Sequence, residues 1–262
     1  MHKENEMKLL ELKNVWKSFG DKDVLKGISF SVQEGEIIGY IGPNGAGKST
    51  TVKLILGLLE LDQGDIFLRG QRITTEDVTY KSQIGYVPEQ TSIYETLTLE
   101  EYILFSGQLY GLSQETIMHR AKPMLEIFEL EDSRDKLLGS FSKGMRQKTL
   151  IIASLIHNPR LIFWDEPLSG LDANTVLLVK EIMLKLSMQG KTIFYSSHNM
   201  DTVEKLSHRI VLLNDGEIIA NGTLEEIQGA ESRSLELFFN EVTGFTQHDA
   251  KAKQFVQALE EA

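Results

Sequence analysis

The sequence of 262 residues contains no cysteine. This absence excludes disulfide bonds and fits the cytosol, but it does not establish that compartment, because many extracellular proteins lack cysteine too. No apolar run approaches the roughly 18 residues that a helix needs to span a bilayer. The opening stretch MHKENEMKLLELKN also lacks the apolar core of a signal peptide. We therefore expect neither a transmembrane helix nor a secretory leader.

Basic residues are in short supply as well. The chain carries 27 lysines and arginines against 38 aspartates and glutamates, which gives a formal net charge of −11. A general nucleic-acid surface requires a basic patch, so this balance argues against a nucleic-acid partner, although it does not exclude a local basic face. Hydrophobic residues make up 41% of the chain, as in ordinary globular proteins, and its length suits one large α/β domain or two small ones.

The stretch GPNGAGKST, residues 42–50, is the most informative part of the sequence. It has the P-loop pattern G-x-x-x-x-G-K-[ST], preceded by an apolar run typical of a buried strand and followed by helical apolar spacing. In such a strand, loop and helix, backbone N–H groups and the positive helix end surround a phosphate chain. Lys48 would supply a cation to the β- and γ-phosphates, and Ser49 a magnesium ligand. A chance glycine turn is the alternative, expected about once in a hundred chains of this length. The predicted phosphate-binding residues are Gly42, Pro43, Asn44, Gly45, Ala46, Gly47, Lys48, Ser49 and Thr50.

Short alternating runs over residues 8–34, broken by the turn signal Gly20-Asp21, predict an antiparallel β layer ahead of the P-loop. Further hairpins are predicted to turn at Arg69-Gly70 and at Asp215-Gly216. Phe19 stands at the end of the first predicted strand. It is either a core residue or an aromatic platform for a purine base, because stacking needs little more than a flat π face.

A helical pattern follows the second hairpin. Thr98 and Glu101 form a capping box, and helical spacing continues with short breaks to about Leu138. A further helix opens at FSKGMRQK and stops before Pro159. These features predict a helical insertion over about residues 98–157.

Two apolar runs end in residues capable of chemistry. The run LIFWDEP is typical of a buried parallel strand, which places Asp165 at the carboxyl edge where α/β sheets bind ligands. A magnesium ion on a triphosphate needs a carboxylate there, and Glu166 is placed to polarise an attacking water. A helix-capping role for Asp165 is the alternative. The run KTIFYSSHNM brings His198 to the same edge of the sheet.

The motifs GPNGAGKST, FSKGM, LIFWDEP, SGLD and SSH occur in an order and spacing that resemble the ATP-binding cassette of ABC transporters. The resemblance covers about residues 8–230. It implies an α/β P-loop NTPase with a RecA-like core, an N-terminal antiparallel β layer and a helical subdomain insertion. Residues 231–262 would form a short C-terminal helical extension.

The resemblance implies roles for the residues of the nucleotide site. Phe19 matches the aromatic residue, usually a tyrosine, that stacks on adenine in this family. Lys48, Ser49 and Thr50 match the residues that hold the phosphates and magnesium. The cofactors implied are therefore ATP and Mg²⁺.

The resemblance also implies how the site would work. Asp165 and Glu166 match the Walker B aspartate and the catalytic glutamate, and His198 matches the switch histidine that contacts the γ-phosphate. In this family, two subunits close head to tail over two ATP molecules. The signature motif, which completes the partner's ATP site, and the D-loop correspond here to Ser142, Gly144 and Asp172.

The sequence departs from the family's pattern near two motifs. Glu89 occupies the place of the Q-loop glutamine after Pro88, and Gln90 follows it. A carboxylate there can still approach magnesium, so Glu89 is a candidate metal ligand, although it adds negative charge beside the γ-phosphate. In the signature, Lys143 and Met145 replace the usual glycine and glutamine. The Lys143 side chain either faces the partner's nucleotide or lies toward solvent.

The acidic residue after Pro88, the SKGM-type signature and SSHNMDTVEKL resemble the ATPases of bacterial ABC-2-type exporters. This resemblance implies an ATPase that forms a homodimer or heterodimer and drives a separate transmembrane permease subunit. The chain would then lie peripherally at the cytoplasmic face of the cell membrane. Coupling helices of the permease would dock in a groove built from about residues 89–105. Candidates for the groove surface, with ordinary packing as the alternative, are Ile93, Tyr94, Leu97 and Leu99.

Two other functions stay open on the sequence. A non-transport ABC-type ATPase would act on a soluble assembly, but the ribosomal kind looks like two cassettes joined by a basic linker. A nucleotide-binding module without turnover is the second alternative. The presence of Lys48, Asp165, Glu166 and His198 argues against it.

The role of Glu89 can be tested directly. We expect Glu89→Gln to leave the affinity for ATP nearly unchanged, because the phosphate loop rather than this side chain provides most of the binding contacts. Equilibrium binding of ATP to both proteins measures this. A large loss of affinity would show that Glu89 is a principal nucleotide ligand.

Overall fold

A computed structural model describes residues 8–90, 93–228, 234–244 and 253–258. Three expectations from the sequence fall partly or wholly outside these ranges. They concern the beginning of the chain at residues 1–7, the boundary between the cassette and its extension at residues 230 and 231, and parts of the extension itself, at residues 231–233, 245–252 and 259–262.

The N-terminal part folds as an antiparallel sheet, as the alternating pattern predicted. Its order is β2-β1-β4-β5, and β1 buries Leu9, Leu10, Leu12 and Val15 in the interior, while Lys8, Lys13 and Asn14 are exposed. Gly20 has a positive φ of 59° in the turn between the first two strands, where a residue with a Cβ would be strained. The strands are β1 (Lys8–Phe19), β2 (Lys22–Gln33), β4 (Gln63–Leu68) and β5 (Gln71–Arg72).

The central sheet has six strands in the order β10-β9-β3-β8-β7-β6, all parallel except for the last hairpin. Strands β3 and β8 are buried along their whole length, which explains why their sequences are apolar apart from Thr192 and Ser196 at the ends of β8. Asp215 and Gly216 both have positive φ in the β9–β10 turn, so the predicted hairpin is confirmed. The strands are β3 (Ile37–Ile41), β6 (Ile84–Val87), β7 (Leu161–Asp165), β8 (Thr192–Ser196), β9 (Arg209–Asn214) and β10 (Glu217–Gly222).

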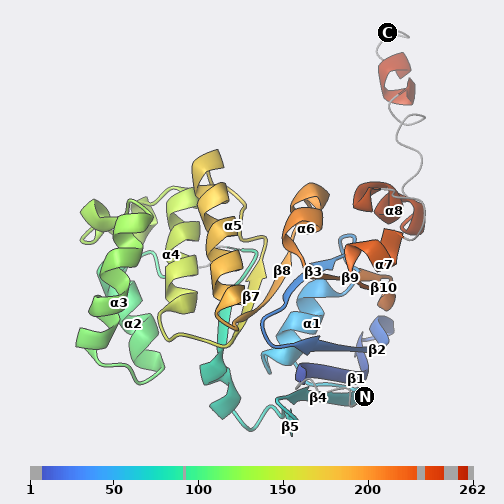
Figure 1. Cartoon of the computed structure of the whole chain (residues 1–262), viewed down its shortest axis with the longest axis horizontal. Coiled ribbons are helices and arrows are strands. Elements are labelled where there is room, and N and C mark those ends of the chain that lie inside the picture. The colour runs from blue at the N-terminus through green and yellow to red at the C-terminus, as the bar shows by residue number, and fades with distance from the viewer. Residues whose placement is uncertain (1–7, 91–92, 229–233, 245–252, 259–262) are drawn as a thin grey trace.

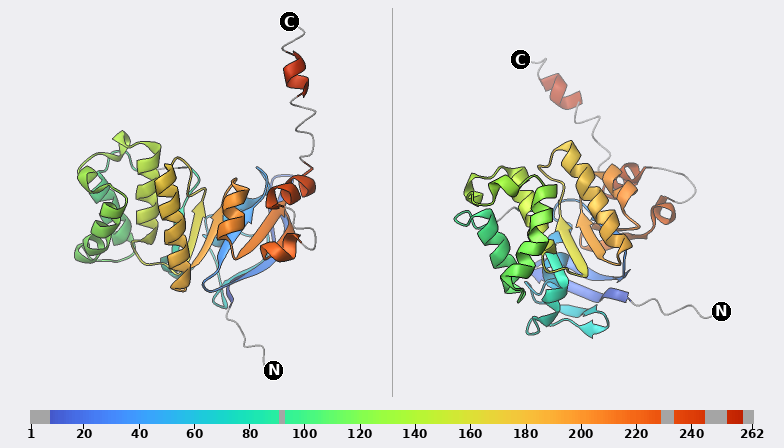
Figure 2. Two further views of the ribbon diagram at one scale, coloured as in Figure 1. Left: turned by 45° about the horizontal axis from the view of Figure 1, so that its top comes forward. Right: turned by 60° about the vertical axis from the view of Figure 1, so that its left-hand side comes forward.

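Helices cover both faces of the central sheet and form a separate group at one end. Helix α1 lies between the two sheets, α5 and α6 cover the opposite face, and α2, α3 and α4 gather at the end away from the N-terminal sheet (Figure 1; the views in Figure 2 agree). The helices are α1 (Lys48–Ile55), α2 (Leu99–Leu109), α3 (Gln114–Ile127), α4 (Lys143–Leu155), α5 (Ala173–Met188), α6 (Met200–Leu206), α7 (Leu224–Gln228) and α8 (Leu235–Val242). Short 3-10 helices span Thr79–Gln83, Glu131–Ser133 and Leu138–Ser140.

The central strands divide their side chains between two apolar cores. On β3, Ile37 and Ile41 pack with α5 and α6, while Ile38 and Tyr40 pack with α1 and the N-terminal sheet. This division follows from the two-residue period of a strand, which sends neighbouring side chains to opposite faces. With both faces buried, polar side chains are accommodated only where the strands end.

The helical segment confirms one local prediction and corrects two others. Thr98 and Glu101 form the predicted capping box at the start of α2. One of the predicted short breaks falls on the 3-10 turn Glu131–Ser133, but the helical spacing predicted from there to Leu138 is wrong, because the chain forms no helix at residues 134–137. Leu99 was wrong as a groove-surface residue: it is 0% exposed and packs in the core, because the first helical turn directs it inward. Tyr94, by contrast, is 60% exposed.

No helix within the described ranges combines the length and the apolar character that crossing a membrane requires.

Candidate functional site

The glycine loop between β3 and α1 is built for close approach to a ligand. Gly47 caps α1 with φ 111°, and a Cβ placed there would lie 2.6 Å from the Leu25 side chain. A Cβ on Gly42 would lie 2.2 Å from the Leu213 carbonyl oxygen. Gly45 also has a positive φ, of 80°, but has nothing within 4 Å of an added Cβ. The loop is therefore packed tightly against the protein at its two ends and is open in its middle.

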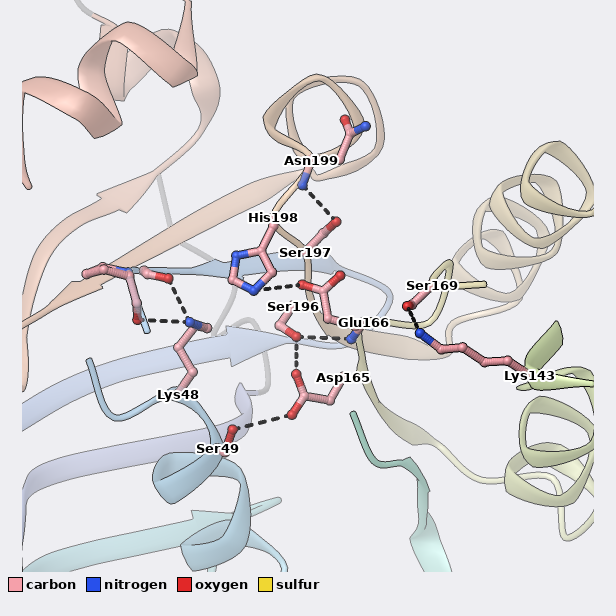
Figure 3. A network of polar contacts seen from close by, with 12 residues as sticks. Lys48, Ser49, Lys143, Asp165, Glu166, Ser169, Ser196, Ser197, His198 and Asn199 are labelled. Atoms are coloured by element: carbon pink, nitrogen blue, oxygen red, sulfur yellow. Dashed lines mark hydrogen bonds and ion pairs between the residues drawn. The ribbon is translucent and has the colours of Figure 1, made fainter. Parts of the chain in front are cut away.

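Lys48 is held inside the curve of this loop. Its Nζ donates hydrogen bonds to the carbonyl oxygens of Gly42, at 2.6 Å, and Pro43, at 3.1 Å (Figure 3). Burial lowers the pKa of Lys48, and the nearby negative charges of Asp165, Glu166 and Glu89 oppose that shift. The loop thus carries a partly buried cation whose only hydrogen bonds within the described chain are to neutral carbonyl groups.

Asp165 joins three elements at the carboxyl edge of the central sheet. It is the last residue of β7, and the register of the parallel strands places it beside Ser196 at the end of β8. Ser196 Oγ donates to one of its carboxylate oxygens, and Ser49 Oγ on α1 donates to the other at 3.4 Å (Figure 3). The hydrogen-bond partners of Asp165 are therefore serines on two other elements. The next helix along the chain, α5, is capped by Asp172. The helix-capping alternative for Asp165 is therefore wrong.

Glu166 and His198 face each other beside Asp165. The His198 Nε2 atom lies 3.7 Å from Glu166 Oε1, and the Glu166 backbone N–H donates to Ser196 Oγ at 3.2 Å. Burial raises the pKa of Glu166, and the charge of Asp165 raises it further, while His198 lowers it. Glu166 Oε1 is buried and accepts no hydrogen bond from the described residues. A half-buried carboxylate with a raised pKa and an oxygen that accepts no hydrogen bond has the properties of a general base.

These groups line one cleft of about 340 Å³, a size typical of small-ligand sites. Phe19 is 49% exposed at its margin, so its aromatic ring is not part of the core. Eleven of the predicted site residues line this cleft. Three other residues that line it were not singled out from the sequence. The full lining comprises Phe19, Lys22, Val24, Asn44, Gly45, Gly47, Lys48, Ser49, Thr50, Glu89, Asp165, Glu166, Ser196 and His198.

The three additional residues are Lys22, Val24 and Ser196. Lys22 pairs with Phe19 across the first hairpin, so the predicted two-residue turn already indicated that the two side chains lie close together. Ser196 ends β8 as Asp165 ends β7, and the same strand-end argument that selected His198 applied to it. Val24 carried no chemical signal in the sequence.

Six predicted residues do not line the cleft. Ser142 caps α4, where its Oγ accepts a hydrogen bond from the Met145 N–H at 3.2 Å. Asp172 caps α5 and accepts hydrogen bonds from Thr175, which hold the pKa of its carboxyl below the usual value. The others are Gly144, on the first turn of α4, and the loop residues Gly42, Pro43 and Ala46.

The raised pKa of Glu166 predicts a pH-dependent stability. The unfolded chain releases this proton near the usual pKa of 4.5 and the folded chain only at higher pH, so ionisation lowers the free energy of unfolding as pH rises through this window. Glu166→Gln cannot ionise. We therefore expect it to melt at a higher temperature than the original protein at about pH 7.5, with the difference shrinking toward about pH 4.

Thermal melts across this pH range measure the difference, with Glu181→Gln, which alters an exposed carboxylate on α5, as the control. A difference in melting temperature between Glu166→Gln and the original protein that increases as pH falls would contradict the raised pKa of Glu166.

Comparison with known proteins relates this architecture to proteins of known class. The family description "ABC transporter" matches residues 25–169. The linearmycin resistance ATP-binding protein LnrL of Bacillus subtilis is 40% identical, over 84% of this chain and 70% of its own. The Nod factor export ATP-binding protein I of Burkholderia lata is 34% identical, over 91% of this chain and 82% of its own.

Solved structures agree with the sequence comparison. The ATP-binding subunit of an ABC transporter superposes with a TM-score of 0.85 at 37% identity, covering 90% of this chain and 99% of the other. A dimeric ATP-binding cassette in a post-hydrolysis state, bound to ADP and Pi, superposes with a TM-score of 0.75 at 28% identity, covering 82% and 98%. With its P-loop, its two-sheet fold and these relatives, the chain belongs to the ABC transporter family as an ATP-binding subunit that hydrolyses ATP for transport.

Proposed function

We propose that this chain is the ATPase of an exporter, peripherally bound at the cytoplasmic face of the cell membrane and driving a separate membrane-spanning permease. The observation that supports the chemistry is the convergence of Lys48, Asp165 and Glu166 on one cleft. The direction of transport rests on similarity to a protein whose name is Nod factor export ATP-binding protein. We assign residues 8–230 to the cassette, with the helical insertion over about 98–157, and residues 231–262 to a C-terminal extension.

ATP would enter with its base toward the N-terminal sheet and its phosphates toward the loop. The exposed ring of Phe19 offers a stacking face at one end of the cleft. The open middle of the loop, around Gly45, would receive the phosphates on backbone N–H groups at the start of α1. Lys48 Nζ would exchange its two carbonyl partners for phosphate oxygens, which are charged and therefore stronger acceptors.

The oxygen donors around Asp165 fit magnesium. Mg²⁺ prefers oxygen ligands and binds through one or two carboxylates together with substrate phosphates and water. The Asp165 carboxylate and the Ser49 hydroxyl already face each other at 3.4 Å, and Glu89 lines the same cleft. These three residues would hold the ion. When bound, the ion would neutralise the charge of the terminal phosphates.

Glu166 would take the proton of the attacking water. Its raised pKa makes the carboxylate a better base near neutral pH than an exposed glutamate, and its Oε1 atom has no hydrogen-bond partner among the described residues to compete with water. His198 Nε2, 3.7 Å away, would steady this carboxylate and contact the terminal phosphate. Lys48 would stabilise the charge that develops on that phosphate.

The site of one chain would be completed by a second cassette. Ser142 and Gly144 lie on α4 and Asp172 precedes α5, and none of them lines the cleft of their own chain. ABC cassettes form dimers, as in the structure that contains ADP and Pi. We infer that these residues contact the nucleotide of the facing subunit, in a homodimer or a heterodimer.

The permease would dock beside the helical insertion. Tyr94 is 60% and Phe105 39% exposed, and their rings meet edge to face with centroids 5.6 Å apart. Ile93 and Leu97 are only partly exposed, and Ile93 packs on the core. An exposed aromatic pair next to a packed apolar base is suited to receive a short helix of a partner.

An affinity pull-down from detergent-solubilised native membranes tests the transport proposal. We expect a polytopic membrane protein of exporter type to be recovered in stoichiometric amount, and Tyr94→Ala to reduce its recovery, because the aromatic pair is lost. Leu237→Ala removes a similarly exposed apolar side chain on α8 and serves as the control. Recovery of ribosomal or other soluble partners without a membrane protein would mean that the ATPase acts outside transport.

A further inference from the structure

Lys143 has a defined partner within its own chain. It is the first residue of α4, and its Nζ donates a hydrogen bond to Ser169 Oγ at 2.8 Å (Figure 3). Ser169 lies in the loop between Glu166 and Asp172. The side chain thus crosses from the signature segment to the loop that follows β7, and neither alternative considered from the sequence describes this contact.

Backbone packing reinforces the contact between the two segments. A Cβ on Gly144 would lie 2.7 Å from the Gly170 carbonyl oxygen, and a Cβ on Gly170 would lie 2.9 Å from Lys143 Cδ. The methylene groups of Lys143 therefore lie directly against Gly170. One turn further along α4, the buried Gln147 Nε2 donates to the Pro167 carbonyl oxygen at 3.1 Å. The start of α4 is in this way attached to residues 167–170 at three points.

The loop of residues 166–171 has an unusual backbone conformation and few hydrogen bonds of its own. Glu166 and Gly170 both have left-handed backbone angles, with φ 49° and 76°. Two hydrogen bonds stabilise the turns between them: Ser169 N–H donates to the Glu166 carbonyl oxygen at 3.1 Å, and Leu171 N–H to that of Leu168 at 3.4 Å. A glutamate in the left-handed region is strained, and it keeps this conformation only where its surroundings enforce it. The contacts from α4 hold residues 167–170, which directly follow Glu166.

Helix stability does not account for a lysine at this position. The amino end of a helix is the positive end of its dipole, where a cation is unfavourable. The first turn of α4 contains no acidic residue that would offset the charge. The favourable contacts of Lys143 are therefore those it makes with Ser169 and Gly170.

We propose that Lys143 is a positioning residue that fixes the loop carrying Glu166 and Asp172 against the turn carrying Ser142 and Gly144. The inference rests on the roles proposed above for Glu166 and Ser142. Through this lysine, the segment that places the general base in one ATP site is rigidly connected to the segment that contacts the other site. Lys143 itself contacts no nucleotide.

Steady-state ATP hydrolysis by the purified full chain tests this assignment. We expect Lys143→Met, which keeps the methylene packing, to lower kcat about fivefold and leave KM for ATP within about twofold, because one hydrogen bond to a charged group is lost. Ser169→Ala should have the same effect, and the double variant should be no worse than either. Lys143→Arg should restore most of kcat. Lys122→Met, on the exposed side of α3, is the matched control.

Hydrogen exchange gives a readout that needs neither ATP nor a membrane partner. Lys143→Met and Ser169→Ala should each raise the exchange rate of the amides of residues 169–171 about tenfold, without lowering the melting temperature. This separates a failure of the inference from a failure of the transport proposal.

Three results would each overturn the inference. One is a raised KM for Lys143→Met with kcat unchanged, which would mean that the ammonium group contacts nucleotide. The others are unchanged exchange in residues 169–171 and effects of the two substitutions that add in full.

Discussion

The carboxylate of Asp165 is the contact on which the site depends. It accepts hydrogen bonds from Ser196 at the end of β8 and from Ser49 in the first turn of α1, while it is itself the last residue of β7. The phosphate loop, the acidic strand and the strand that leads to His198 are thereby joined at one point. Because β3, β7 and β8 are parallel neighbours, sheet register rather than loop conformation sets the spacing of these groups.

The burial of the central sheet explains why the chemistry lies at its edge. Side chains of β3 pack into two different apolar cores, so a polar group within the strand would be costly. Glu166 lies just beyond this boundary and is still in an unfavourable environment. Burial raises the pKa of its carboxyl, and its backbone is in the left-handed region. The same environment makes it reactive. Stability and reactivity are therefore set against each other at this residue.

Much of this arrangement could be predicted because its signals are local. The glycine spacing of residues 42–50, the apolar runs that end at Asp165 and His198, the capping box at Thr98 and the hairpin at Asp215-Gly216 each depend on a few adjacent residues. They therefore indicated the phosphate loop, the buried parallel strands and most of the cleft, while the family resemblance implied the complete fold class and Glu89. The family resemblance added the roles of Ser142 and Asp172, which still stand as predictions.

The rest depended on contacts between distant segments. The burial of Leu99 follows from the way α2 packs on its neighbours, and Leu99 shares the buried helical face of Ile103 and Gly107, a spacing that the sequence interpretation did not use. The helical spacing just before Leu138 does not form a helix, because the carbonyl groups of Arg134 and Lys136 accept hydrogen bonds from the start of α2 instead. Lys143 reaches Ser169, 26 positions away, so the two alternatives considered from the sequence omitted its actual partner.

The central claim is that each chain contributes half of two shared ATP sites, with Glu166 as the base. Light scattering during gel filtration of Glu166→Gln with ATP and Mg²⁺ tests it most directly, with phosphate release measured on the same sample. The account predicts an ATP-dependent dimer and the loss of most turnover, because binding persists while the base is gone. A variant that stays monomeric with ATP and hydrolyses it at the original rate would contradict the account.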